Sequence, residues 1–550
     1  MLASVDSPTL RKTRGAFFTP PHLCDFVVEW AVRSSSERVL EPSCGEAAFL
    51  TSAGRRLRTL GAPVPALQGV EIHAASAIAA QARLAHEGLS ASIVVDDFFR
   101  VCGEGSVDVV VGNPPFVRFH DFAGESAARA REVAGRAGVQ LTRLASSWAA
   151  FTVHAATFLR PGGRLGLVVP AELLSVNYAA NVRRFLAQSF ESVRLVLFAN
   201  RAFPDVLQDV VLLFADGYGC GPARKWEVQR IDDASALALS GPVSTDWAAA
   251  SDGHRWSDVL LDSERREVFE RTSSGPGVAP LQSWGETSLG MVTGNNRWFV
   301  RSPAEAGQLG LQSEELVPVS PPGSAHLRGL DFTALDWRRM GVEGRRTELV
   351  RPGLEPGVSA RRLIAEGVAA GVDRAYKCRV RKPWWRVPLV RPPDLFVTSM
   401  NADTPRLIGN SAQVRHLNSV HGLYLRPGLR EPGWDLPVAA LNSLTVLGAE
   451  IVGRSYGGGI LKLEPREADL LPVPDPEVVT GLSAELRRVR EQIARLLAGR
   501  HLLEAISLVD QIVLVDGLGI APSEVACLEA GHRSLQARRV GRGRSAWKSG

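Results

Sequence analysis

The sequence predicts an α/β protein with a doubly wound sheet in its N-terminal part, a mixed α/β domain after it, and helices near the C-terminus. Residues 1–215 alternate short apolar runs with helical stretches, which is the pattern of a parallel sheet covered by helices on both faces. This rhythm stops after about residue 220, and residues 281–475 are instead rich in Pro, Gly, Arg and Trp. A chain of 550 residues is too long for one ordinary hydrophobic core, so we expect two or three domains.

The strands and the first helix can be placed from apolar spacing and turn residues. Seven apolar runs are expected to form the N-terminal sheet: Arg38–Leu40, Leu67–Glu71, Ser92–Val95, Val107–Gly112, Arg164–Val169, Ser192–Phe198 and Val210–Phe214. We expect Thr19 to cap a helix, because Pro20 and Pro21 suit a first helical turn. The segment Pro161-Gly162-Gly163 is expected to end another helix and to turn into the strand that follows.

Composition gives the expected boundaries. The first domain covers residues 1–240, and a linker over 241–280 contains the Ser/Gly/Pro-rich stretch 272–280. The second domain covers 281–475, and residues 533–550 form a basic tail that we expect to be mobile. A helical region over 476–532 lies between them, where apolar residues recur at steps of three and four: Leu482, Leu486, Val489, Ile493, Leu496 and Leu497.

Charge, cysteines and hydropathy narrow the class of protein. The net charge of +5 and the pI near 9.0 are compatible with a polyanionic partner. No apolar run reaches the roughly 18 residues of a membrane helix, and the N-terminus lacks a signal-peptide pattern. The scattered cysteines show no Cys-x-x-Cys spacing, so we expect free thiols, no metal site and a cytoplasmic protein: Cys24, Cys44, Cys102, Cys220, Cys378 and Cys527.

The most informative segment is Val107–Phe116, which reads Val-Asp-Val-Val-Val-Gly-Asn-Pro-Pro-Phe. An apolar strand stops at Gly112, and a rigid tip follows it. The two prolines fix φ and lack N–H donors. Carbonyl acceptors are therefore left at the carboxyl end of a strand, where open α/β sheets bind ligands. An amide oxygen, a free carbonyl and an aromatic ring together suit a planar base held by its exocyclic amino group. The alternative is a strand that merely ends in a proline-rich turn.

Three other strand ends carry polar side chains. Glu41-Pro42-Ser43-Cys44-Gly45 is a small-residue turn that allows a ligand to approach the backbone, and its single glycine disfavours a dinucleotide. Glu71 ends the next strand and suits a ribose diol. Asp97 suits an adenine amino group, and Phe98 can stack on the adenine ring. Each of these has a structural alternative: a plain turn, a surface glutamate, and a capping aspartate beside core phenylalanines.

These motifs together resemble those of gamma-class adenine-N6 DNA methyltransferases, the TaqI-type modification enzymes of restriction–modification systems. Asn113–Phe116 resembles their catalytic motif, Glu41–Gly45 their S-adenosylmethionine motif, and Arg14–Pro21 the segment before their first helix. The order of the three along the chain is that of the gamma class. The similarity continues in the C-terminal half, in Gly290–Phe299, Tyr376–Trp385 and Tyr456–Pro465.

The resemblance implies a Rossmann-like, S-adenosylmethionine-dependent domain that methylates the N6 amino group of an adenine flipped out of DNA. Asn113 and the carbonyl of Pro114 would accept the amino protons, with Pro115 completing the rigid motif. Phe116 would stack on the target base, and Phe151 would lie on the other side of that base. The cofactor pocket would be lined by Thr19, Glu41, Pro42, Cys44, Gly45, Glu71, Asp97 and Phe98.

Two positions depart from the family pattern. Phe116 stands where tyrosine is commoner, which keeps the stacking surface and removes a hydroxyl. Ala47 stands where glycine is frequent, and a small side chain should be tolerated there.

Residues 281–475 would form the target-recognition domain, with double-stranded DNA as the partner. The stretch Val372–Arg391 is basic and aromatic, and positive charge provides phosphate affinity while arginine can also read guanine. The alternative is a solvated basic face. The residues expected to contact DNA are Arg374, Lys377, Arg379, Arg381, Lys382, Trp384, Trp385 and Arg386.

Other functions use the same motif. Amino-group methylation of RNA or of protein glutamine, cytosine-N4 methylation, and a catalytically silent DNA-binding scaffold all stay open. The long second domain favours DNA, and the leading Asn favours adenine. We expect the chain to modify DNA without cutting it, because the cofactor segment begins near Arg14 and no nuclease motif is evident after Pro476. Any cognate endonuclease would then be a separate polypeptide.

Overall fold

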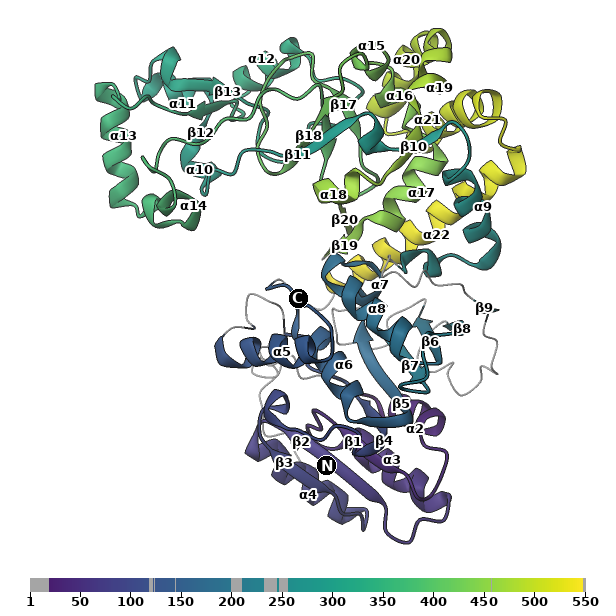
Figure 1. The fold of residues 1–550 in the computed structure, drawn as a ribbon. Coiled ribbons are helices and arrows are strands. Elements are labelled where there is room, and N and C mark those ends of the chain that lie inside the picture. Colours follow the sequence, from purple (N-terminus) through teal and green to yellow (C-terminus); the bar gives the residue numbers. More distant parts are fainter. Residues whose placement is uncertain are drawn as a thin grey trace. The chain divides into compact units, whose positions relative to one another are not determined.

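The computed structural model describes residues 19–117, 122, 124–143, 145–198, 210–231, 245–246, 256–456 and 458–547. The chain divides into two compact units, Met1–Leu260 and Leu261–Gly550, and each is described by itself (Figure 1). Residues 14–18 of the segment before the first helix, and Gly457, lie outside the described residues. Within the described part of the chain, no helix is long and apolar enough to cross a membrane.

The first unit is built on a central sheet whose described strands follow the order β3-β2-β1-β4-β5-β7-β6-β8-β9 (Figure 1). Strands β1 to β5 run parallel to one another, as predicted, whereas β7 runs antiparallel to both β5 and β6. The α/β prediction is confirmed, with this reversal as the main departure. The strands are Arg38–Glu41 (β1), Ala66–Glu71 (β2), Ser92–Val95 (β3), Val107–Gly112 (β4), Leu159–Pro170 (β5), Ser192–Phe198 (β6), Val210–Asp216 (β7), Lys225–Ile231 (β8) and Thr245–Asp246 (β9).

Helices of the first unit pack in two groups. One group comprises α2, α3 and α4, which contact strands from β1 to β5, and the other contains α5, α6 and α8. All six residues of β4 are buried, as expected for a strand covered on both faces. The helices are Pro21–Ala31 (α2), Ala48–Thr59 (α3), Ala74–His86 (α4), Gly124–Arg136 (α5), Ser147–Thr157 (α6), Glu172–Ser175 (α7) and Ala180–Ser189 (α8).

Two local predictions in the first unit are wrong. The N-cap of α2 is Pro20 and not Thr19, and no side chain caps the helix. The Thr19 hydroxyl instead accepts a hydrogen bond from a distant amide, as described below. Pro161-Gly162-Gly163 lies inside β5, because α6 already ends at Thr157 and strand pairing resumes at Leu159 with a shift of register. Gly163 is needed there, since a Cβ would lie 3.0 Å from the Asp108 carbonyl oxygen.

The strand order brings the chemistry-bearing strand ends together. Chain order reverses at β1, which has β2 on one side and β4 on the other. Ligands of open α/β sheets bind at the carboxyl ends of the strands beside such a reversal. Glu41 ends β1, Glu71 ends β2, and Asn113 follows β4. The fold therefore gathers these three residues at one edge of the sheet.

The second unit mixes short strands and helices, as predicted for this part of the chain. Its strands form a sheet in the order β11-β18-β15-β17 and three smaller sheets. Its strands are Val278–Pro280 (β10), Gly285–Leu289 (β11), Val300–Arg301 (β12), Leu316–Pro318 (β13), Glu348–Val350 (β14), Leu395–Thr398 (β15), Met400–Asn401 (β16), Leu407–Gly409 (β17), Val420–Leu425 (β18), Arg454–Tyr456 (β19), Ile460–Lys462 (β20) and Pro472–Pro474 (β21).

Helices accompany these strands and dominate the C-terminal part of the unit. A π-helical turn at Asp510–Gly517 follows α21. The helices are Ser263–Ser273 (α9), Asn296–Phe299 (α10), Pro303–Gln308 (α11), Ala334–Val342 (α12), Val358–Ala369 (α13), Tyr376–Arg379 (α14), Arg430–Gly433 (α15), Leu436–Ala439 (α16), Ser443–Val452 (α17), Pro465–Ala468 (α18), Pro476–Gly481 (α19), Ser483–Ala498 (α20), Leu502–Val509 (α21) and Pro522–Trp547 (α22).

The segments expected as a linker and as a tail differ from those expectations where they are described. Within 241–280, α9 is a regular helix and β10 pairs with β21. Residues 533–547 continue α22 instead of forming a loose tail. Arg539 explains the difference, because it is 3% exposed, lies 2.7 Å from the Glu450 carboxylate and donates to the Asp403 carbonyl at 2.8 Å. Basic composition alone does not show that an arginine has a buried partner.

Candidate functional site

The turn after β1 is fixed to the sheet and leaves open space beside its backbone at Gly45. Cys44 is 3% exposed, and its N–H donates to the Val70 carbonyl of β2 at 2.9 Å. Gly45 has φ +49°, and a Cβ placed there would meet nothing within 4 Å. Ala47 has φ +61°, a left-handed conformation that favours glycine, and it is fully buried. The turn is therefore pinned to the sheet at one end while space stays open above Gly45.

Glu71 fixes this turn through both carboxylate oxygens. Oε2 accepts from the Gly45 N–H at 2.9 Å, and Oε1 accepts from the His73 N–H at 2.9 Å. Each carboxylate oxygen has a second lone pair that can take a further donor. The next residue, Ile72, is 57% exposed and lies beside Glu71 at the end of β2. Ile72 was missed in the sequence because a single apolar residue after a strand carries no pattern.

Glu41 lies deeper than Glu71 and holds the helix that follows. It is 3% exposed, and its Oε2 accepts from the Leu50 N–H at 3.0 Å. Burial raises the pKa of this carboxyl well above its usual range, and the nearby charge of Glu71 raises it further. Glu41 thus holds the first turn of α3 against the end of β1. The next residues are the buried Pro42 and the half-buried Ser43.

Asp97 and Phe98 lie just after β3, and Asp97 has the capping role of the structural alternative. Asp97 caps a short 3₁₀ turn by accepting from the Phe99 N–H at 3.1 Å, which leaves its other oxygen for a second donor. Phe98 is 3% exposed and stacks at 5.3 Å from the ring of Phe151. The sequence predicts that these two rings stack on different bases, whereas the structure packs them together in a cluster that also contains His154 and Phe158.

Asn113 has an acceptor without a partner. Its Nδ2 lies 3.2 Å from the Thr19 Oγ1, which accepts the hydrogen bond. Its Oδ1 is buried and has no hydrogen-bond partner among the described residues. Ser43 secures the backbone at this point, because its hydroxyl donates to the Asn113 carbonyl at 3.3 Å. A buried amide oxygen without a donor is unfavourable in a folded protein, and it leaves an acceptor that the donor of a ligand could use.

The proline tip after Asn113 is fixed from α6. Ser147, the first residue of that helix, donates from its hydroxyl to the Pro115 carbonyl and accepts from the Val117 N–H at 2.9 Å. Within the described part of the chain, no donor reaches the carbonyl of Pro114. Phe116 is 7% exposed, so its ring lies largely within the protein. Sequence reasoning missed Ser147, which shares no motif with the tip.

Two of the three C-terminal motifs, Gly290–Phe299 and Tyr376–Trp385, pack on each other. Arg381 donates from its guanidinium to the Thr293 carbonyl and lies over the Phe299 ring at 5.2 Å. Trp384 packs at 4.9 Å from Trp298, and Trp385 contacts Trp384 at 6.2 Å. Arg381, Trp384 and Trp385 therefore hold this part of the unit together. Of the residues expected to contact DNA, the exposed ones are Arg374, Lys377, Arg379 and Lys382.

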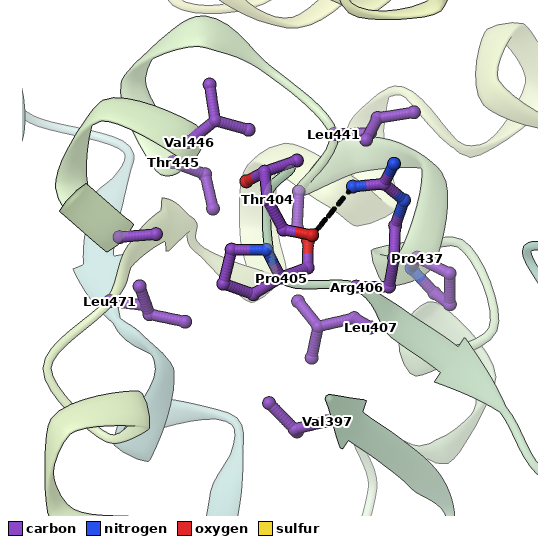
Figure 2. A pocket seen from close by; sticks show the side chains of 12 residues that line it. Val397, Thr404, Pro405, Arg406, Leu407, Pro437, Leu441, Thr445, Val446 and Leu471 are labelled. Atoms are coloured by element: carbon purple, nitrogen blue, oxygen red, sulfur yellow. Dashed lines mark hydrogen bonds between the residues drawn. The ribbon is translucent and has the colours of Figure 1, made fainter. Parts of the chain in front are cut away.

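Two hollows of the second unit differ in character. Figure 2 shows a small pocket of about 20 Å³ lined mainly by apolar residues of β15, β17, α16 and α17, where Arg406 donates to the Thr404 carbonyl at 3.0 Å. Its volume suits about one water molecule. A wider, open concavity of about 430 Å³ is lined by Asn296, Arg297, Pro321, Pro322, Gly344, Arg345 and Arg346, and is therefore basic.

Comparisons with known families cover both units. Residues 4–216 match the family described as N-6 DNA Methylase. Residues 253–514 match the family described as the C-terminal domain of the type II methyltransferase M.Eco57I. The two matches follow each other along the chain with a short interval between them.

Individual relatives extend over most of the chain. It is 26% identical over 479 residues to the type II methyltransferase M.XamI of Xanthomonas campestris pv. amaranthicola, covering 84% of this chain and 85% of that protein. It is 20% identical over 468 residues to the type II methyltransferase M.AccI of Acinetobacter calcoaceticus, covering 83% and 84%. The solved structure of the type IIL restriction-modification enzyme MmeI in complex with DNA matches with a TM-score of 0.58 and 13% identity, over 94% of this chain and 75% of that one, which is a likeness of fold.

Proposed function

We propose that this chain, which is an N6-adenine DNA methyltransferase of restriction–modification type, holds the amino group of its target adenine with Asn113 and Pro114. The supporting observation is the Asn113 Oδ1, a buried acceptor without a partner among the described residues. The carbonyl of Pro114 is the next acceptor along the same rigid tip. An N6 amino group has two protons, and these two acceptors match that number.

Both acceptors favour the nucleophilic form of the amino group. An adenine N6 lone pair is normally conjugated with the ring and is a poor nucleophile. Hydrogen bonds to two acceptors outside the ring plane draw that nitrogen toward tetrahedral geometry, which frees the lone pair. Thr19 keeps the Asn113 amide turned with its oxygen toward the base, because the amide nitrogen is engaged at 3.2 Å. No strong base is required beforehand, since the nitrogen becomes acidic only after it has gained the methyl group.

The residues at the turn after β1 fit S-adenosylmethionine, which supplies an electrophilic sulfonium methyl group when bound. Gly45 leaves room for a ligand beside the backbone. Glu71 and Asp97 each keep lone pairs for hydroxyl and amino donors, and we assign Glu71 to the ribose and Asp97 to the adenine of the cofactor. Ile72, exposed beside Glu71, provides an apolar contact for the adenine ring. Glu41, Pro42 and Cys44 shape the turn, and Phe98 supports Asp97 from the aromatic cluster.

The aromatic residues set the conditions for base entry. We assign Phe116 and Phe151 to the two faces of the target base, which must leave the duplex to reach them. Both rings are 7% exposed. Stacking on them therefore requires local movement that uncovers one face of each ring.

The partner we propose is double-stranded DNA bound by residues 281–475. Arg374, Lys377, Arg379 and Lys382 are exposed and suit phosphate contacts. Arg381, Trp384 and Trp385 contribute by holding this surface in shape. We further propose that the protein acts in the cytoplasm, and that its cognate endonuclease is a separate polypeptide.

The test is methyl transfer to mixed genomic DNA, followed by mapping of modified bases by sequencing. Asn113→Ala should lower turnover about 10²-fold or more, because it removes a contact needed in the transition state, and cofactor affinity should stay near normal. Asn181→Ala makes the same change in α8, outside the site, and should retain turnover. Near-normal turnover of Asn113→Ala, or modified cytosine in place of adenine, would show that the proposal is wrong.

A further inference from the structure

Three arginines of the second unit gather on one extended segment, residues 386–390. Arg351 follows β14, and its Nε donates to the Val387 carbonyl at 2.8 Å. Arg415 follows β17, and its Nε donates to the Val390 carbonyl at 2.9 Å. Arg386 belongs to the segment itself, and all three side chains are half-buried. The fold therefore brings three arginines that are far apart in the sequence to the same segment, residues 386–390.

The positive charges of this cluster are not neutralised within the described protein. Arg351, Arg386 and Arg415 form no ion pair with any described residue, whereas comparable half-buried arginines do, such as Arg346 with Glu305 at 3.5 Å. Burial and the charges of the other two arginines lower the pKa of Arg351. Asp394 and Glu286 act on the Tyr424 hydroxyl together with Arg415, but neither carboxylate forms an ion pair with a described arginine of the cluster, and Asp394 lies 3.4 Å from Arg430.

The hydrogen-bonding groups of the cluster are also incompletely used. The Nε of Arg386 is buried and has no partner among the described residues. In Arg351 and Arg415 the Nε–H donates to a backbone carbonyl, and the two terminal guanidinium nitrogens have no acceptor among the described residues. Clustered like charges with free donors destabilise the free protein. An oxyanion placed among them would remove the repulsion and accept the free N–H groups, since guanidinium forks match phosphate geometry.

We propose that Arg351, Arg386 and Arg415 form a binding site for one phosphodiester group of the DNA backbone. The inference rests on DNA as the proposed partner and adds a site that the basic stretch alone did not indicate. A phosphate is favoured over a guanine edge, because a guanine edge is neutral and takes one guanidinium fork. Arg391 extends the positive surface beside the site, where it lies over the Tyr424 ring at 4.5 Å.

Arg386→Gln tests the site most cleanly, because the Arg386 side chain forms no hydrogen bond or ion pair with a described residue. Binding of a fluorescent 30-base-pair duplex of arbitrary sequence would be followed by anisotropy over a range of KCl concentrations, with the full chain. We expect weaker binding at moderate salt and a log–log salt slope shallower by about 0.9, the value for one lost phosphate contact. Thermal unfolding without DNA should be unchanged or occur at higher temperature, since the substitution removes a repelling charge and an unpaired donor.

The controls separate this site from general electrostatics and from folding. Arg386→Lys keeps the charge and should restore the slope, and Arg488→Gln removes an exposed charge from α20 and should leave it unchanged. Arginine labelling of the unaltered protein by phenylglyoxal needs no variant: the duplex should protect Arg351, Arg386 and Arg415 but not Arg488.

Each contrary result is specific. An unchanged slope in Arg386→Gln, or no protection from labelling, would overturn the phosphate site. If the salt slope of Arg386→Gln is unchanged but its modification map shows an altered sequence preference, the cluster contacts a guanine base and not a phosphate. A fall in unfolding temperature with no loss of DNA binding would show that Arg386 is structural. The modification map made with the unaltered protein tests the proposed function by itself, so failure of this site is distinguishable from failure of the proposed function.

Discussion

Replacing Thr19 by valine tests how the catalytic amide is oriented. The Thr19 hydroxyl is 3.2 Å from Asn113 Nδ2, and among the described side chains it is the partner that fixes the direction of that amide. Ser43 holds the Asn113 backbone carbonyl only, at 3.3 Å. Thr19→Val keeps nearly the same shape at a site that is 7% exposed, and it removes the acceptor. The amide oxygen should then spend less time in the orientation that receives the target amino group.

The magnitude follows from the contact. A hydrogen bond between neutral groups contributes about 1 kcal/mol net, and 1.4 kcal/mol corresponds to a tenfold change in rate. We therefore expect kcat to fall about 5-fold, well short of the loss predicted for Asn113→Ala. Thr19→Ser keeps the hydroxyl and should retain most of kcat.

Steady-state kinetics with S-adenosylmethionine as the varied substrate distinguishes two roles of Thr19. Orientation of Asn113 lowers kcat and leaves the KM for the cofactor nearly unchanged. Direct contact with the cofactor, the role implied by the family resemblance, raises that KM and spares kcat. Thr272→Val removes a hydroxyl that is also 7% exposed, in α9, and controls for the loss of a buried hydroxyl. A raised KM with normal kcat in Thr19→Val, or failure of Thr19→Ser to retain activity, would refute the orienting role.

Two further predictions concern stability of the second unit. Arg539→Met should leave the buried Glu450 carboxylate unpaired and destabilise the unit by about 3–5 kcal/mol in urea unfolding. The double variant Arg539→Met with Glu450→Met should recover much of that loss. A double variant as unstable as Arg539→Met alone would contradict the role of the pair. Burial raises the pKa of Asp510 from 3.8 to about 6, so its folded state binds a proton more tightly than its unfolded state. The stability contributed by this group is complete below pH 4 and is lost as pH rises through 6. In Asp510→Asn, the midpoint of unfolding should therefore depend less on pH between 4 and 6. An unchanged dependence on pH would show that Asp510 is not its cause.

The sequence predicts the strands of the first unit well because their signal is local. Apolar runs of the right length ended at turn residues, and Ser92–Val95, Val107–Gly112 and Ser192–Phe198 have the predicted bounds. Parallel strands also place their carboxyl ends at one edge, so the grouping of Glu41, Glu71 and Asn113 could be expected. The reversed β7 could not, because an apolar run does not encode the direction of its strand.

Contacts between distant residues account for what was missed. Thr19 and Asn113 are separated by 94 residues, and Ser147 reaches the Pro115 carbonyl across 32. Both side chains also suit a local role: Thr19 suits a helix cap, and Ser147 is the first residue of α6. The sequence alone predicts the local role and not the distant contact. Arg351 and Arg415 lie outside the basic stretch and join Arg386 only through the fold.

The unsatisfied groups of the two units follow one physical rule. The amide oxygen of Asn113 is buried without a donor, and Arg386 is half-buried without an acid among the described residues. Neither group contributes to the stability of the free protein, because a buried polar group without a partner lowers stability by about 1–3 kcal/mol. A ligand that supplies the missing partner gains this energy on binding. An amino group satisfies the first and an oxyanion the second, and DNA carries both.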